Sequence, residues 1–232
     1  MAEMPPGSGP PRIFMSYTHV DRGLATFLGN GIGQYFEVQI GLGAVEAGRP
    51  WVERLLDDIR RSDVEGVPVG GSAWREFEDV CVEILKFLFV PPLSEPKIQP
   101  RTYSGTERRD AVFPNRNHRR HDNWGILLSE LGARLILFEF KNYDRTEIGK
   151  DEIIQTSSYL TQPMGRLAAI VGSKKPNPGA HTERNQIFSS SKNVILFLTK
   201  EHLVEMLYMK ERGEDPSDLI MDEVELFYLQ HE

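Results

Sequence analysis

Short apolar and alternating stretches near the N-terminus predict a first structural unit of strands and helices. Residues 12–17 and 36–40 have the hydrophobic pattern of short strands. Asp21 can cap a helix that follows it, and a stripe of apolar residues over 51–61 predicts a second, amphipathic helix. Residues 41–50, which contain several glycines and a proline, are expected to form the loop before that helix. The predicted order is strand, helix, strand, helix.

A second unit follows residues 64–71, whose adjacent glycines and proline predict a linker. Within 72–232 strands alternate with helices, and the strongest strand pattern lies at 134–141. The other strands are expected at 109–113, 167–172 and 193–199, and the helices at 74–90, 123–131, 150–161, about 200–212 and 216–230. This alternation predicts an α/β or α+β sheet that helices cover on both faces.

Composition excludes several classes of site. The 232 residues are 40% apolar and 26% charged, and no apolar run approaches the roughly 18 residues of a membrane span. Residues 1–11 are rich in Pro, Gly and Ser, so we expect them to be disordered. They also lack a signal-peptide pattern, so we do not expect secretion. Cys81 is the only cysteine, which excludes an internal disulfide and a cysteine-rich zinc site. These features favour a cytoplasmic protein with no membrane partner.

The net charge of −7 does not by itself indicate nucleic-acid binding. The stretch 97–121 is locally basic, however, with seven Lys and Arg residues against Glu107 and Asp110. A basic segment on an acidic protein can contact a phosphate backbone. On charge alone, a solvated loop is the better interpretation of this stretch.

Glu139 and Lys141 are the first candidate site residues. Side chains two residues apart on a strand share a face, which places these two about 6.7 Å apart. An isolated Glu-x-Lys triplet is common by chance and would be interpreted as a strand-end ion pair. Asp110 changes that interpretation, because it opens a separate short strand directly after Arg108 and Arg109.

Two carboxylates from neighbouring strands can meet as oxygen ligands of one cation. Asp110 and Glu139, together with the main-chain carbonyl of Phe140 and waters, would make a suitable Mg²⁺ site. The cation would polarise a scissile phosphate and lower the pKa of an attacking water. Lys141 could orient that water or neutralise charge that develops on the phosphate.

The same residues resemble the PD-(D/E)XK nuclease superfamily, especially its restriction-endonuclease-like branch, over about 72–232. The resemblance implies a mixed sheet core flanked by helices, with Asp110 and Glu139 as metal ligands and Lys141 as a catalytic residue. It also implies supporting roles for Gln155 on the following helix and for Glu78 on the first core helix. In this chain the motif aspartate follows Arg109 rather than a proline.

The resemblance implies a Mg²⁺-dependent endonuclease, for which Mn²⁺ is a possible substitute, with DNA as the expected substrate and prokaryotic defence as the expected setting. Cleavage of both strands by one site per chain would favour a homodimer. Two site residues have alternative interpretations. Gln155 could be a polar position on an exposed helix face, and Glu78 could be a solvent-facing partner of Arg75.

The N-terminal unit, residues 12–63, resembles the first half of a TIR domain, through the stretches 12–21 and 48–63. A TIR glutamate helix often reads Ser-x-Trp-x-x-x-Glu, and the residues from Ser72 to Glu78 fit that pattern. We interpret the unit as a truncated, partial βαβα segment without its own activity. Two other hypotheses stay open: a TIR-type NAD hydrolase or nucleotide-sensing module that uses Glu78, and a non-catalytic DNA-binding module.

Overall fold

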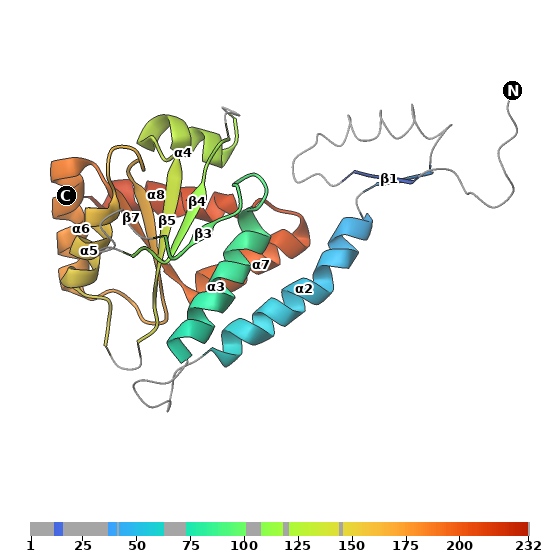
Figure 1. Ribbon diagram of the computed structural model, residues 1–232, viewed down its shortest axis with the longest axis horizontal. Helices are drawn as coiled ribbons and strands as arrows, with labels where there is room; N and C mark the ends of the chain where they lie inside the picture. The colour runs from blue at the N-terminus through green and yellow to red at the C-terminus, as the bar shows by residue number, and fades with distance from the viewer. Residues whose placement is uncertain are drawn as a thin grey trace, which may run out of the picture.

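The main sheet of this protein has five strands in the order β3-β4-β5-β6-β7 (Figure 1). The computed structural model describes residues 12–15, 37–40, 42–62, 73–100, 108–117, 121–143 and 146–231. The strands are β3 (Lys97–Ile98), β4 (Ala111–Pro114), β5 (Leu135–Lys141), β6 (Leu167–Gly172) and β7 (Val194–Thr199). Strands β3 to β5 pair antiparallel, and β5 to β7 pair parallel. The α/β class is confirmed, and the sheet is mixed.

Helices cover both faces of this sheet, as the alternation of strands and helices predicts. One face packs against α3 (Ala73–Phe89), α4 (Asn123–Leu131), α7 (Lys200–Arg212) and α8 (Ser217–Gln230). The other face packs against α5 (Lys150–Tyr159) and α6 (Pro178–Ser191). Figure 1 shows α5 and α6 on the opposite side of the sheet from α3 and α7.

Strand β5 is central because both of its faces are buried. Phe138 and Phe140 face the larger core, and Leu137 faces the smaller one. The Phe138 ring packs edge-on against Phe113 of β4, with ring centroids 5.3 Å apart. A strand that is apolar on both faces is fixed in register by packing from two directions, so the residues at its end are held firmly.

The sequence pattern predicts helix α4 correctly but does not predict helix α6. Asp122 accepts a hydrogen bond from the Gly125 N–H at the start of α4, and Gly132 ends the helix in the left-handed region. Helix α6 begins after the capping residue Asn177, but buries little apolar surface. The sequence therefore lacks the apolar stripe that would have indicated this helix.

Helix α2 (Leu42–Arg61) is longer than predicted. The loop expected over 41–50 is wrong for 42–50, which form the first half of this helix. Glycine and proline have low helix propensity, which is why the sequence alone predicts a loop here. The segment is nevertheless helical and continues directly into the helix over 51–61. The apolar stripe of 51–61 is buried in the same core as α3 and α7, a packing that Figure 1 also shows. The hydrophobic residues of the stripe are Val52, Leu55, Leu56 and Ile59.

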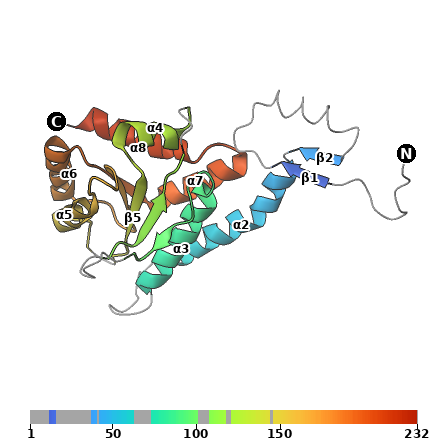
Figure 2. The same ribbon diagram turned by 45° about the horizontal axis from the view of Figure 1, so that its top comes forward.

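The strands predicted nearest the N-terminus are present as β1 (Arg12–Met15) and β2 (Glu37–Ile40). They pair parallel in a separate two-stranded sheet (Figure 2). The helix expected after Asp21, the disorder expected for 1–11 and the linker expected at 64–71 lie outside the described residues. None of the helices that the structure describes is both long and apolar enough to cross a membrane.

The turn before β6 packs closely against the end of helix α4, and this contact can be tested. Gly165 has φ +98°, and a Cβ there would lie 2.1 Å from the carbonyl oxygen of Gly132. Gly132 also has a positive φ, of +59°, but a Cβ on it would meet nothing within 4 Å. We expect Gly165→Ala to lower the free energy of unfolding by roughly 3–5 kcal/mol, from strain plus overpacking. Gly132→Ala, with strain alone, should lower it by about 1 kcal/mol. Urea unfolding measures both, and equal losses would contradict the close approach.

Candidate active site

The antiparallel pairing of β4 with β5 brings Asp110 to the end of β5. The ladder between these strands finishes at Ala111 and Phe138. Beyond it, the Asp110 side chain takes the place of a main-chain partner, and its Oδ2 accepts a hydrogen bond of 2.9 Å from the Phe140 N–H. Glu139 and Lys141 project from β5 on the same face, so the structure brings all three expected site residues together.

The carboxyl groups of Asp110 and Glu139 lie within hydrogen-bonding reach of each other. Glu139 is only 2% exposed, and its Oε1 is buried with no hydrogen-bond donor. Burial and, second to it, the neighbouring charge of Asp110 raise the pKa of Glu139 to about 8, although the charge of Lys141 lowers it. The pair therefore holds a proton at neutral pH. A bound cation would neutralise the same two carboxylates and provide the buried oxygen with a partner.

Lys141 compensates only part of this negative charge. Its Nζ lies 3.8 Å from Glu139 Oε2, which is an ion pair but beyond hydrogen-bonding distance. The same Nζ donates to Oε1 of Gln155 on α5, at 3.4 Å. Gln155 in turn donates from Nε2 to the Tyr159 hydroxyl at 2.9 Å. Although Gln155 is exposed, it lies between Lys141 and a buried tyrosine, and so it helps to orient the ammonium group.

The Phe140 carbonyl lies on the same side of β5 as the Asp110 side chain. In a strand, the N–H and C=O of one residue point to the same side. Because the Phe140 N–H is bonded to Asp110, its carbonyl also points to the side where β4 has ended. The residues expected as cation ligands therefore fit a hard cation in chemistry, with two carboxylates and one main-chain oxygen.

Glu78 approaches Asp110 from the other face of the sheet. It lies on α3, which packs against the larger core, and it is 5% exposed. Its Oε1 accepts a 2.9 Å hydrogen bond from Nε2 of Gln99. Burial raises the pKa of Glu78, the Gln99 bond lowers it and the Asp110 charge raises it. A solvent-facing position for Glu78 is therefore wrong.

Two supporting interactions were not expected from the sequence. Gln99 bonds Glu78 across 21 positions of sequence, and no local pattern signals such a contact. Tyr143, two residues after the end of β5, donates from its hydroxyl to Glu152 of α5 at 2.7 Å. Glu152 also accepts from the Gly149 N–H at 2.9 Å. These bonds fasten the start of α5, and with it Gln155, to the end of β5.

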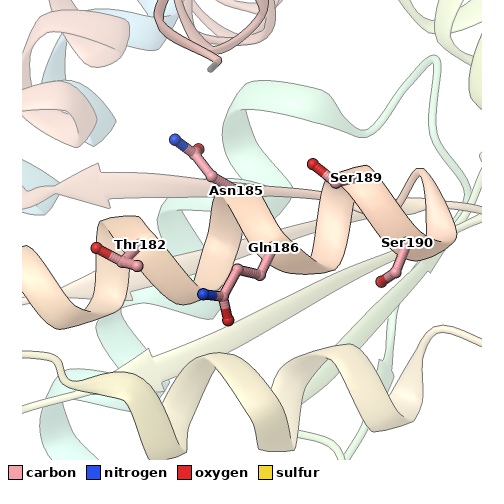
Figure 3. A pocket seen from close by; sticks show the side chains of 5 residues that line it. All are labelled: Thr182, Asn185, Gln186, Ser189 and Ser190. Carbon is pink, nitrogen blue, oxygen red and sulfur yellow. The ribbon is translucent and has the colours of Figure 1, made fainter.

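Two hollows on the described part of the surface lie away from the carboxyl pair. One hollow of about 520 Å³ runs along α6, lined by polar side chains from that helix alone (Figure 3). Another hollow, of about 460 Å³, lies beside Gly165 and Asn193, where β6 and β7 begin, at the opposite end of the strands from Glu139 and Lys141. Neither hollow includes Asp110 or Glu139. Within the described ranges, no group of three or more His, Cys, Asp or Glu side chains could hold a metal ion. The candidate ligand set is therefore two carboxylates and a carbonyl.

Comparison with known proteins finds one partial similarity. The chain is 27% identical over 160 residues to the putative transposon gamma-delta 80.3 kDa protein of Escherichia coli (strain K12). The match covers 68% of this chain but only 22% of that relative's length. No family model matches the chain. No solved structure matches it either.

The buried carboxyl pair predicts a specific dependence of stability on pH. The folded protein raises the pKa of Glu139 from 4.5 to about 8. The stability that this proton contributes is complete below pH 4.5 and is lost as the pH rises through 8. In the absence of divalent cations, we expect Glu139→Gln to flatten this dependence. At pH 9 the variant should be more stable than the original protein, by an amount on the order of a few kcal/mol.

Urea unfolding in a chelating buffer between pH 5 and pH 9 measures this difference. Glu53→Gln provides a matched control, because Glu53 is exposed on α2. An identical pH dependence in Glu139→Gln and the original protein would contradict the buried pair.

Proposed function

We propose that this protein is a metal-dependent phosphodiesterase that hydrolyses nucleic acid, with DNA as its substrate. The observation that carries the proposal is the meeting of the Asp110 and Glu139 carboxyl groups beside Lys141. Two adjacent carboxyl groups, one of them with a buried oxygen that has no hydrogen-bond partner, are unfavourable in an apolar core. They become favourable when a divalent cation lies between them, which supports a catalytic metal site.

Each residue has a distinct role in this proposal. Asp110, Glu139 and the Phe140 carbonyl would hold Mg²⁺, or Mn²⁺ in its place. A cation bound there would polarise the scissile phosphate and lower the pKa of an attacking water. Lys141 lies on the Glu139 face and would donate to phosphate oxygens as negative charge develops on them. Gln155 holds the Lys141 ammonium by the 3.4 Å contact and limits its rotation.

Several features support a nucleic acid as the substrate. Arg108 and Arg109 immediately precede Asp110 and provide positive charge for phosphates. The name of the E. coli relative refers to a transposon, a DNA element, which favours DNA over RNA. Since each chain offers one such site, cutting both strands together would require a second copy.

A second candidate activity is NAD hydrolysis by a TIR-like unit. The parallel pairing of β1 with β2 favours it, because two strands joined by a helix, as in the expected βαβα segment, pair parallel. The position of Glu78 favours the nuclease instead. Its carboxylate is buried, is bonded to Gln99 and lies near Asp110 rather than in a site of its own.

Cleavage of plasmid DNA tests the proposed activity. We expect the purified protein to cut it with Mg²⁺ or Mn²⁺ and to stop when the cation is chelated. Asp110→Ala and Lys141→Ala should each lower the rate by roughly 100-fold or more, because each removes charge that acts on the transition state. Asp222→Ala on α8 and Lys150→Ala on α5 are matched controls, since both residues are exposed, and should cleave at the original rate.

Cleavage that persists unchanged in Asp110→Ala and Lys141→Ala would overturn the assignment. DNA binding without cleavage in any cation would favour the non-catalytic DNA-binding module. NAD consumption that is lost in Glu78→Ala would favour the second candidate, and it can be measured on the same protein samples.

A further inference from the structure

Gln99 has a backbone conformation that its residue type rarely adopts. It follows the short strand β3 and has φ +50°, in the left-handed region. Lys192, the other non-glycine residue that the described part of the chain places there, ends helix α6, where this conformation is usual. Gln99 ends no helix, and a long unbranched side chain gains nothing locally from a positive φ. The conformation is therefore maintained by what Gln99 contacts.

Two hydrogen bonds from Gln99 reach two site residues. Its main-chain N–H donates to the carbonyl of Asp110 at 2.8 Å. Its side-chain Nε2 donates to Oε1 of Glu78 at 2.9 Å. Glu78 belongs to α3 and Asp110 directly precedes β4, so a single residue connects the two elements at the candidate active site.

The side-chain bond matters because of where Glu78 lies. Glu78 is only 5% exposed, so water cannot readily replace a missing donor. Gln99 is itself exposed and covers this buried group from outside. The charges of Asp110, Arg108 and Asp79 all act on Glu78. Of these, Asp110 is a proposed cation ligand, so the position of Glu78 changes the electrostatic field at the ligand set.

Glu78 acts on that set from a distance. The described residues contain no group of three acidic side chains close enough to share one ion, so Glu78 does not complete the ligand set. It contributes negative charge beside Asp110, and that contribution depends on its distance and orientation. Among residues suited to a positive φ, asparagine is too short to reach Glu78 and glycine has no donor. Glutamine supplies both the reach and the donor, at the expense of strain.

We propose that Gln99 is a positioning residue for the cation site: it holds the Glu78 carboxylate beside Asp110 and thereby strengthens binding of the divalent ion. This inference rests on the proposed function and adds to it a residue that does not touch the cation. Neighbours of metal ligands commonly change metal affinity by about 10-fold or more when they are removed.

Binding of Mn²⁺ alone to the whole protein, by isothermal titration calorimetry, tests the inference without any cleavage assay. We expect Gln99→Met to weaken Mn²⁺ binding about 10-fold, because methionine keeps the length but lacks the donor. Gln99→Asn should weaken it similarly, although asparagine tolerates the positive φ. Gln162→Met is the matched control and should bind Mn²⁺ as the original protein does. Gln162 is exposed and lies near the start of β6, at the opposite end of the sheet from the site.

A double-mutant cycle separates positioning from a general structural effect. If Gln99 acts through Glu78, then Gln99→Met should add no further loss in a Glu78→Gln background. Raising the Mn²⁺ concentration should also restore DNA cleavage by Gln99→Met. Fold-changes that multiply in the double variant would overturn the inference. So would original-like binding by Gln99→Met or Gln99→Asn, or an equal loss in Gln162→Met.

The two proposals fail in different measurements. An original protein that binds no Mn²⁺ would overturn the proposed function and this inference with it. An original protein that binds Mn²⁺, together with a Gln99→Met variant of unchanged affinity, would overturn the role of Gln99 alone.

Discussion

The hydrogen bond from the Phe140 N–H to the Asp110 carboxylate determines the geometry of the whole candidate site. A buried strand must satisfy its main-chain donors, and β4 has no residue paired with Phe140. The Asp110 side chain fills that position, which fixes one carboxylate oxygen at the edge of the sheet. Glu139, the residue before Phe140, projects beside it from a strand that is packed on both faces. The same bond that completes the sheet therefore brings the two carboxyl groups together.

The cost of this arrangement is electrostatic, and the surrounding core can support it. Burial and the neighbouring Asp110 charge raise the pKa of Glu139 to about 8, so the negative form of Glu139 is unfavourable in this interior. Two hydrophobic clusters flank β5 and prevent the strand from moving to separate the carboxylates. Lys141 cannot relieve the pair completely from 3.8 Å, because Gln155 also holds its ammonium group. A site that is rigid, negative and incompletely paired is suited to bind a divalent cation.

The sequence was sufficient for every part that depends on local periodicity. The strand period of two places Glu139 and Lys141 on one face, and the capping pattern locates the start of α4 at Asp122. The meeting of Asp110 with Glu139 depends on the register between β4 and β5, which no local pattern contains. The remaining errors have physical causes: α6 buries little apolar surface, and the glycines of 42–50 hid the first half of α2. Gln99 was missed because its role depends on a left-handed conformation and on a contact 21 positions away.

Asp110 lies between two acidic groups that approach it from opposite faces of the sheet. Glu139 shares its face with Lys141 and α5, whereas Glu78 comes from α3 in the larger core. Each has a different partner: an ammonium for Glu139 and an amide for Glu78. An ammonium partly neutralises a charge, whereas an amide only orients it. The charge of Glu78 is also influenced by the positive charge of Arg108. The negative charge around Asp110 is therefore partly balanced by Lys141 from the face of Glu139. In the proposed function, this asymmetry would place the cation at Asp110 and leave Lys141 for a phosphate on the face of Glu139.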